Sequence, residues 1–472
     1  MANSKFKATI KRNLLTILTI TAVILSIIVG ISMRISHSSY SPRVVMYVNF
    51  IGDLFLRMIR AITLPLIISS VIAAIAPLDI SLSKKIGTHA IIYIVSTTLI
   101  AVIIGIILVL TIKPGGTAIE NDNVEERERQ GNTIVDTMLD LLRNLFPPNI
   151  VQATLQTYQT VLTPPDNKTD TNVYDWTISS KYVDGTNMLG IISVSIIFAI
   201  TLSTIRSKVV NLVTVLLEFM QAMMKIVQVI IWVTPVAVFF LILAKFLEMD
   251  DIVDVFSKLG LYVATVASGI FIQGFIFLPA LFFGFTRKNP FKFLGQIGPA
   301  ILTALGTSSS LATLPVSMQC VEENAGIDPR VVRFMLPLGA TINMNGTALY
   351  EAVASIFIAQ LKQMDLSVGN VVAIVLTATA ASIGTAGVPQ AGLVTLIMVL
   401  DTIGIPAEDV SLIIAIDWIV GRLRTTLNVM GDAYGAAIIE ATSRKELEKL
   451  PLHNVKVADE IDSKQSTVAA SS

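Results

Sequence analysis

Six charged or amide side chains stand in an otherwise apolar stretch near the end of the chain, from about residue 406 to 441. Ionisable groups at membrane depth are costly, so they mark sites that bind or move a solute. Arg424, Asn428 and Asp432 are spaced four residues apart, which puts them on one face of a helix. A guanidinium facing a cavity can hold a carboxylate, and amide and carboxylate oxygens suit a hard cation such as sodium. The six residues are Asp417, Arg422, Arg424, Asn428, Asp432 and Glu440.

A second polar cluster, from Asn343 to Thr347, interrupts the apolar stretch 331–361. Its two asparagines and Gly346 are expected to unwind a helix and free carbonyl oxygens for a cation. Glu351 follows one turn later, and a buried carboxyl of this kind can carry a proton. The two clusters together predict a site for an anionic solute and its coupling cations.

Each charged group also has a structural alternative. An Arg424–Asp432 or Arg422–Asp417 ion pair could simply join helices, since ion pairs in apolar surroundings also serve packing. Glu351 could be a hydrogen-bonded structural acid with no part in proton transfer. These alternatives stay open at the level of sequence.

The composition indicates a membrane protein. Of 472 residues, 53% are hydrophobic and 14% charged, and the mean hydropathy is +0.73. Lys+Arg and Asp+Glu balance at 34 each, so charge gives no reason to propose nucleic acid as a partner. The single Cys320 excludes an intrachain disulfide framework, and three histidines leave little for a zinc or iron centre. With no nucleophile–base pair or phosphate loop either, we expect no enzyme and no cofactor beyond coupling ions.

The apolar stretches predict an all-α polytopic membrane protein with eight transmembrane helices. Two further segments, 291–317 and 370–400, are interrupted by small polar residues and glycine. Non-helical backbone at membrane depth must face protein or a watery cavity, so we expect two re-entrant helical hairpins with their tips at the site, although small residues also allow close helix packing. Their similar construction suggests inverted repeats. The eight predicted spans are 13–33, 45–76, 86–112, 188–205, 209–246, 254–285, 331–361 and 406–441.

Basic residues set the predicted orientation. When the spans alternate, the Lys/Arg clusters fall on one side, which makes both termini cytoplasmic. The polar stretch 113–187 then lies outside, and it carries a glycosylation sequon at Asn167. The tail from about residue 449 to 472 is polar and weakly patterned, which predicts disorder.

Several motifs resemble those of the excitatory amino acid transporters, the animal branch of the sodium:dicarboxylate symporter family. The resemblance runs from about residue 13 to 447. Its motifs are Gly306-Thr307-Ser308-Ser309-Ser310, Gly339-Ala340-Thr341-Ile342-Asn343-Met344, Ala381-Ser382-Ile383-Gly384, Gly387-Val388-Pro389-Gln390-Ala391-Gly392, Arg422-Leu423-Arg424-Thr425-Thr426 and, towards the animal branch, Arg143-Asn144-Leu145-Phe146-Pro147-Pro148-Asn149.

The resemblance implies a plasma-membrane homotrimer in which a mobile transport domain slides across the membrane against a scaffold, as an elevator. It implies sodium-coupled symport of acidic amino acids or related dicarboxylates, with an associated anion conductance. The implied divisions are a cytoplasmic N-terminus 1–12, scaffold helices 13–85, transport-domain helix 86–112, an extracellular loop and the start of the fourth helix 113–187, scaffold helices 188–252, a transport domain 253–448 and a cytoplasmic tail 449–472.

The resemblance also implies roles for single residues. Arg424 would hold the side-chain carboxylate of the substrate, and Glu351 would couple protons and potassium. The implied substrate contacts are Ser310, Thr347, Val388, Gly392, Arg424, Thr425 and Asn428. One implied sodium site comprises Gly339, Asn343, Asn428 and Asp432, a second Thr341, Ser382, Ile383 and Thr385, and a third Thr97, Thr98, Asn343 and Asn345.

Three positions depart from the family pattern. Gly421 stands where the glutamate and aspartate carriers have the Asp that pairs with the substrate ammonium, Asn345 replaces a sodium-site carboxylate, and Leu311 replaces a serine. Two buried negative charges are thereby lost, which predicts a weakened third sodium site and a preference for an amine-free dianion. The competing interpretation is that Asp417 or a bound water holds the amine, so that acidic amino acids remain substrates. The chain could also function mainly as an anion channel, or bind a solute without transporting it.

Overall fold

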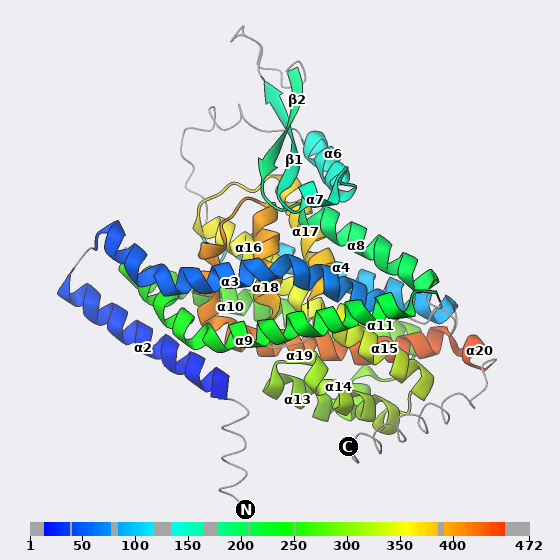
Figure 1. Ribbon diagram of the computed structural model, residues 1–472. Coiled ribbons are helices and arrows are strands. Elements are labelled where there is room, and N and C mark those ends of the chain that lie inside the picture. The colour runs from blue at the N-terminus through cyan, green and yellow to red at the C-terminus, as the bar shows by residue number, and fades with distance from the viewer. Residues whose placement is uncertain are drawn as a thin grey trace, which may run out of the picture.

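The computed structural model describes most of the chain, and all structural statements below concern those residues. Most of these lie in helices, as Figure 1 shows. The described ranges are 14–37, 40–76, 84–116, 134–163, 177–205, 208–248, 252–385 and 391–448.

Six helices coincide with predicted spans to within a few residues. Five helical stretches of the described chain are long and apolar enough to cross a membrane: Ile17–Ser36, Pro42–Ala73, Ile86–Ile112, Val210–Glu248 and Ser257–Thr286. This confirms a helical protein with several membrane-compatible helices, while the full set of eight spans stays a prediction. The six helices are α2 (Leu14–Ser36), α3 (Pro42–Ile75), α4 (Lys84–Ile112), α8 (Met188–Thr204), α9 (Val210–Glu248) and α19 (Ser411–Thr442).

The long helices α2, α3 and α9 run beside one another along one side of the molecule (Figure 1). They carry many exposed apolar side chains, among them Ile28, Phe50 and Trp232, each more than half exposed. Apolar surface of this extent needs lipid or another subunit against it. These three helices are therefore suited to an outer layer around the polar centre described below.

Two predicted spans are interrupted. The stretch 254–285 forms α10 (Ile252–Phe271), the π-helical segment η5 (Ile272–Phe277) and α11 (Leu278–Thr286). The stretch 331–361 forms α15 (Pro329–Ile342) and α16 (Asn345–Leu361), and the two residues between them have non-helical backbone angles. The predicted unwinding at the Asn343-Met344-Asn345 cluster is thus confirmed.

Both glycine-interrupted segments form pairs of helices. In the first, α13 (Gly298–Thr307) and α14 (Ser310–Gln319) are joined by Ser308, in a left-handed conformation with φ 53°, and by Ser309, which caps α14 by accepting from the Ala312 N–H. α12 (Pro290–Gln296) precedes this pair and the π-helical η6 (Cys320–Asn324) follows it. In the second pair, α17 (Val368–Gly384) packs on α18 (Ala391–Thr402), and residues 386–390 between them lie outside the described ranges. Short elements η7 (Ala407–Val410) and α20 (Arg444–Leu447) flank α19.

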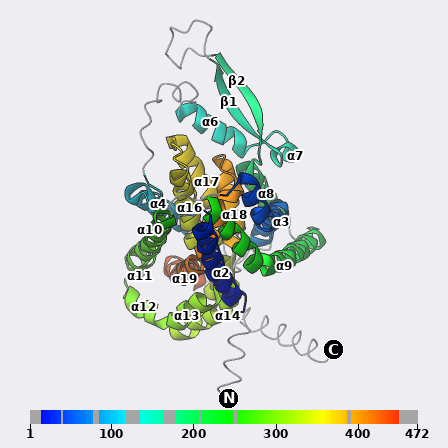
Figure 2. The same ribbon diagram turned by 90° about the vertical axis from the view of Figure 1, so that its left-hand side faces the viewer.

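The stretch predicted to be an extracellular loop contains a folded unit that the sequence did not predict. It comprises α6 (Ile134–Leu145), α7 (Ile150–Ala153) and two antiparallel strands, β1 (Gln156–Thr163) and β2 (Thr177–Asp184). The register runs from the Gln156–Asp184 pair to the Thr163–Thr177 pair. Because β2 is exposed along almost its whole length, the apolar alternation that normally reveals a strand is missing. Figure 2 shows this unit standing beyond the ends of α16, α17 and α18.

Candidate functional site

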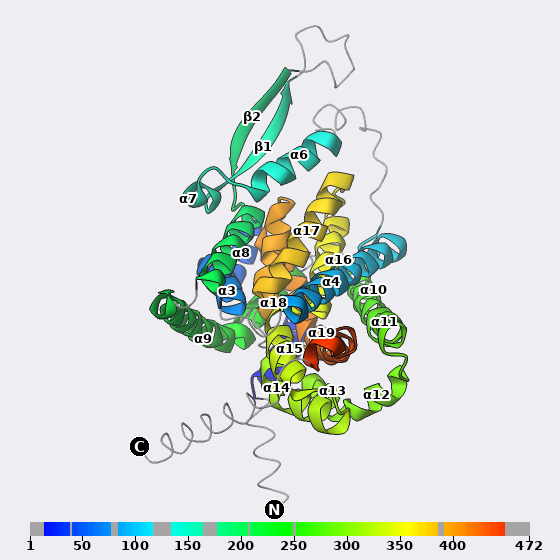
Figure 3. The same cartoon turned by 90° about the vertical axis from the view of Figure 1, so that its right-hand side faces the viewer.

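The polar residues singled out in the sequence meet where α4, α16, α18 and α19 pack together, at the centre of the molecule (Figure 3). α16 and α18 are buried along most of their lengths, so a charged side chain that points between them is shielded from solvent. Arg424 of α19 points between these helices and is 5% exposed. Gly392 of α18 makes the approach possible, because a Cβ there would lie 2.5 Å from the Arg424 Nη1.

The partner of Arg424 is Asp417, two helical turns earlier on α19. Asp417 Oδ1 lies 3.4 Å from Arg424 Nη1, and both side chains are almost fully buried. The guanidinium also stacks over the ring of Tyr350, with 4.5 Å between the guanidinium carbon and the ring centroid. Both ion pairs offered as structural alternatives are therefore wrong. In the described chain Arg424 pairs with Asp417 and not with Asp432, and Arg422 does not pair with Asp417.

Arg422 points elsewhere and supports the first helix pair. Its Nη1 donates hydrogen bonds to the carbonyl oxygens of Leu305 and Gly306, at 2.8 and 3.0 Å. These are carbonyls at the end of α13, where the helix leaves them without an intrahelical partner. The contact holds the tip of this pair, with the buried Ser310, against α19 at a residue between Asp417 and Arg424.

The Arg424–Asp417 pair retains unused hydrogen-bonding capacity. Within the described chain, Arg424 Nη1 and both carboxylate oxygens of Asp417 have no hydrogen-bond partner, because the pair is held at ion-pair distance without hydrogen-bond alignment. Buried polar atoms are nearly always satisfied, and exceptions call for a ligand or water. The arrangement can accept one carboxylate at Arg424 and one donor at Asp417.

The residues of the first expected sodium site lie close together, and their role as a sodium site stays a prediction. Asn343 Nδ2 donates to Asp432 Oδ1 at 2.9 Å, and the Asn343 Oδ1 is buried without a partner in the described chain. Gly339 lies against the same carboxylate, since a Cβ there would overlap Asp432 Oδ1. Asn428, one turn before Asp432, is bound to the start of α16 instead, where its Oδ1 accepts from the Gly346 N–H at 2.7 Å. Two buried side-chain oxygens and a close backbone are thus brought together there.

The residues of the expected third sodium site also meet. Thr98 Oγ1 donates to Asn345 Oδ1 at 2.8 Å, and Thr97 Oγ1 lies 3.4 Å from the same oxygen. Gln273, from the π-helical segment η5, donates to the Thr97 carbonyl at 3.1 Å. The amide nitrogen of Asn345 is buried without an acceptor in the described chain. This cluster carries no formal charge, and weak sodium binding at it stays a prediction.

The second expected sodium site is not joined by side-chain hydrogen bonds in the described chain. The hydroxyls of Thr341, Ser382 and Thr385 donate to carbonyls of their own helices, at 2.8, 2.8 and 3.2 Å, and Ile383 is partly buried. Thr385 also donates to the Thr395 hydroxyl at 3.2 Å. The grouping of these four residues as a sodium site stays a prediction.

Glu351 ends a chain of hydroxyls that the sequence did not reveal. The Thr395 hydroxyl donates to Glu351 Oε1, while Oε2 is buried and without a partner in the described chain. Glu351 itself is fully buried. Thr395 was not identified from the sequence, because a threonine surrounded by apolar residues gives no periodic signal. Tyr350 was not identified either, because a lone aromatic residue usually belongs to the core.

The other predicted substrate contacts are buried close by. Thr347 lies 3.4 Å from the Asn428 amide nitrogen, and Thr425 donates to the carbonyl of Gly421 at 2.9 Å. The remaining two predicted positions, Val388 and the glycosylation site Asn167, fall outside the described residues.

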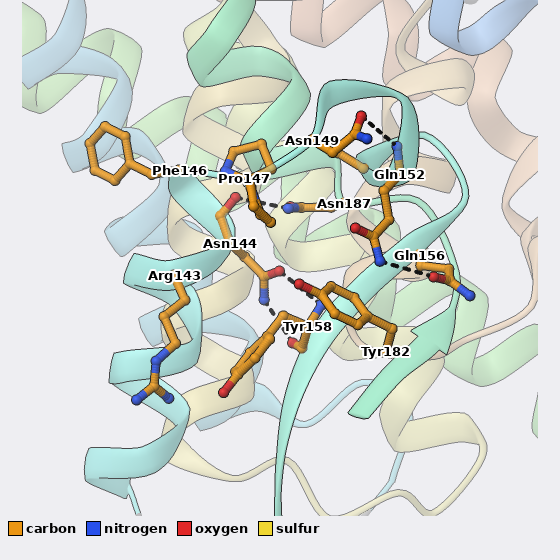
Figure 4. A pocket seen from close by; sticks show the side chains of 12 residues that line it. Arg143, Asn144, Phe146, Pro147, Asn149, Gln152, Gln156, Tyr158, Tyr182 and Asn187 are labelled. Atoms are coloured by element: carbon orange, nitrogen blue, oxygen red, sulfur yellow. Dashed lines mark hydrogen bonds between the residues drawn. The ribbon is translucent and has the colours of Figure 1, made fainter. Parts of the chain in front are cut away.

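The Arg143–Asn149 motif serves a structural purpose. A pocket of about 290 Å³ lies in the unit formed by α6, α7, β1 and β2. Figure 4 shows that its amide side chains bind one another or nearby backbone. Asn144 donates from Nδ2 to the Tyr158 carbonyl at 2.9 Å and accepts the Tyr158 N–H at 3.0 Å. Asn187, which precedes α8, donates to the Asn144 carbonyl at 2.8 Å. The motif thus joins α6, β1 and α8, and its amides are engaged already.

Broken helices that enclose buried charges, inside a shell of apolar helices, define a helical membrane protein of the transporter class. The model of one family, the sodium:dicarboxylate symporter family, matches residues 15–442, so the chain belongs to this family. It is similar to the excitatory amino acid transporter 3 of Mus musculus, at 47% identity over 93% of the chain and 88% of the relative. An excitatory amino acid transporter of Caenorhabditis elegans is 45% identical over 93% and 90%, and the excitatory amino acid transporter 2 of Homo sapiens is 43% identical over 93% and 80%. The chain is a membrane transporter, and it is not an enzyme.

Proposed function

We propose that this protein is a sodium-coupled symporter of the plasma membrane that carries acidic amino acids or related dicarboxylates. The observation that carries the proposal is the Arg424 guanidinium, buried between α16, α18 and α19 with Nη1 lacking a hydrogen-bond acceptor in the described chain. A permanent charge in such a place favours a carboxylate ligand. The relatives named as excitatory amino acid transporters support the same class of solute.

Sodium coupling has its structural support in the Asp432 cluster. A carboxylate whose neighbours are an amide and a glycine, at the break between α15 and α16, offers the oxygen ligands that sodium requires. Glu351, with one oxygen bound to Thr395 and the other unbound, is proposed as the group that couples protons and potassium.

The transport movement is proposed to be of the elevator type, within a homotrimer. α13–α14 and α17–α18 would be re-entrant hairpins that close the site from opposite sides. The Arg422 contact to the α13 carbonyls supports a transport domain in which the first pair moves together with α19. Both termini are proposed to be cytoplasmic, as the basic residues predict.

The substrate's amine decides between two versions of this function. A Cβ at Gly421 would lie 3.6 Å from Arg424 Nη2 and 4.0 Å from Asp417 Oδ2, so residue 421 borders the charged pair without filling the space beside it. Asp417 is the carboxylate closest to that space that the structure describes, and it is engaged by Arg424. This favours an amine-free dicarboxylate over glutamate or aspartate, unless a bound substrate takes Arg424 and frees Asp417 for its ammonium.

Uptake into liposomes containing the purified full chain tests the proposal. Under an inward sodium gradient, labelled aspartate, glutamate, taurine and succinate are compared, with Arg424→Gln as the variant that should abolish uptake of every carboxylate. Uptake that does not depend on sodium, or that persists in the Arg424→Gln variant, would contradict the proposal. An anion current without accumulation of any labelled solute would instead support the channel alternative.

A further inference from the structure

A large cavity lies away from the central site, beside the end of α19. Its volume is about 940 Å³, and it opens between α11–α12 on one side and α15, α19 and α20 on the other. Figure 3 shows α11, α12 and α13 curving round this end of α19. The basic residues here belong to the face predicted to be cytoplasmic. The charged residues that line the cavity are Lys288, Lys292, Asp328, Arg330, Glu440, Arg444 and Glu448.

The acids of one wall are already engaged. Asp328 Oδ2 accepts from Arg330 Nη2 at 2.6 Å, and Arg330 Nη1 donates to the Leu447 carbonyl at 3.0 Å. Glu440 Oε1 accepts the backbone N–H of Asp328 at 2.8 Å. These bonds hold the start of α15 to the end of α19 and to α20. They pair Asp328 with Arg330, and Glu440 binds the backbone of Asp328 and forms no ion pair with a lysine across the cavity in the described chain.

Glu448, the third acid, pairs with a cation of its own wall, since its Oε1 lies 3.6 Å from Arg444 Nε. The opposite wall carries Lys288, in the connection before α12, and Lys292, in α12; the two are four residues apart and both exposed. Neither forms an ion pair with any residue in the described ranges. The two lysines therefore present positive charge to the cavity, and no carboxylate in the described ranges forms an ion pair with either of them.

Exposed aromatic side chains accompany the two lysines. Phe285 lines the cavity and is 55% exposed, and Phe291 beside Lys292 is 62% exposed. The membrane-compatible stretch Ser257–Thr286 ends directly before this corner. Aromatic rings and lysines directly beyond a span are the residues that lie at the level of lipid headgroups.

We propose that this cavity binds the headgroup of an anionic phospholipid, with its phosphates on Lys288 and Lys292 and its acyl chains against Phe285 and Phe291. Basic pockets between membrane helices on the cytoplasmic side favour polyphosphorylated headgroups, and lysine binds phosphate as a point charge. The aromatic residues favour a lipid over a free phosphate ion, because only a lipid has apolar chains to cover them. A bound headgroup would link α11–α12 to the Asp328–Arg330 wall, and this binding does not depend on which solute is carried.

Native mass spectrometry of the purified full chain with phosphatidylinositol bisphosphate tests the proposal by counting bound lipid. The double variant Lys288→Gln with Lys292→Gln should bind about tenfold or more weakly, because each lysine near an anionic headgroup contributes appreciably to affinity. Lys208→Gln is the matched control, since Lys208 is an exposed lysine of the same predicted face, between α8 and α9, and it should leave binding unchanged. Lys288→Arg with Lys292→Arg keeps the charges and should keep the binding.

Inositol trisphosphate, the headgroup without acyl chains, separates the two sources of phosphate. It should bind at least tenfold more weakly than the lipid, and the lipid should bind far better than phosphatidylcholine. Equal lipid binding by the wild type and the double glutamine variant would overturn the proposal. Equal affinity for inositol trisphosphate and the lipid would overturn the claim that the acyl chains contribute to binding.

Discussion

Gly421→Asp is the substitution that tests the substrate preference most directly. The Cβ of the new residue would be 3.6 Å from Arg424 Nη2 and 4.0 Å from Asp417 Oδ2, which are ordinary contact distances, so a Cβ at this position fits without moving its neighbours. Its carboxylate would lie roughly 5 Å from the guanidinium, where two unit charges attract by about 3 kcal/mol at an effective dielectric constant of 20. A substrate ammonium at a similar distance would gain a comparable attraction.

The substitution should therefore raise the preference for aspartate over succinate. Part of the Coulomb attraction is lost to desolvation, and we expect a net change of about 1.5 to 3 kcal/mol, which corresponds to a shift of roughly tenfold to one-hundredfold in the ratio of kcat/KM values. Gly421→Asn is the matched control, because it has the same shape without the charge and should not shift the ratio.

Competition uptake in proteoliposomes, with both labelled solutes at equal sodium, measures this ratio. Two results together would refute the inference that Gly421 disfavours amine-bearing substrates. The wild type would transport aspartate with a KM similar to its KM for succinate, and Gly421→Asp would leave the ratio of kcat/KM values unchanged. Asp417→Asn should then abolish aspartate uptake, because Asp417 would be the group that holds the ammonium.

Three further changes have defined outcomes. Asn345→Asp adds a carboxylate beside the hydroxyls of Thr98 and Thr97, so the sodium concentration for half-maximal uptake should fall several-fold, whereas Asn345→Ala should not lower it. Gly392→Ala places a methyl group 2.5 Å from Arg424 Nη1, and uptake should fall at least tenfold while the melting temperature changes little. The hydrogen bonds from Arg330 hold the pKa of Asp328 below its usual value. The charged Asp328 therefore stabilises the fold fully at pH values above the usual pKa of an aspartate, and this stabilisation is lost as the pH falls through the lowered pKa. Asp328→Asn keeps the cap of α15. Its melting temperature should be lower than that of the wild type at pH 7, and the difference should shrink below about pH 4. A difference that does not change with pH would contradict this.

The sequence predicted the elements whose signals are local. Long apolar runs located α3, α4 and α9, and the asparagines on either side of Met344 located the helix break, because a broken helix needs residues that tolerate non-helical backbone. The connection between α13 and α14 at Ser308 was predicted in the same way, from small polar residues and glycine that tolerate non-helical backbone. Each of these elements is determined by residues that are only a few positions apart in the sequence.

The partners within the site could not be predicted in the same way. Arg424 has acids seven residues before it and eight after it on one helix, and spacing alone leaves both within reach. The choice of Asp417 depends on α18, where Gly392 admits the guanidinium, and on Tyr350 of α16, which provides a ring face for it. Such a choice is a property of packing between helices that are far apart in sequence.

The buried charges themselves explain why a cation must accompany the solute. Arg424 and Asp417 neutralise each other, while Asp432 is bound by an amide and pairs with no cation of the described chain. Before a solute binds, the site therefore carries one uncompensated negative charge if Glu351 is protonated. An acidic amino acid brings one further net negative charge, and an amine-free dicarboxylate brings two. Uncompensated charge in a low-dielectric interior costs several kcal/mol, so either solute can cross only with cations. The amine changes how many cations are needed and where they bind, but the requirement for them arises already from Asp432 and the substrate's carboxylates.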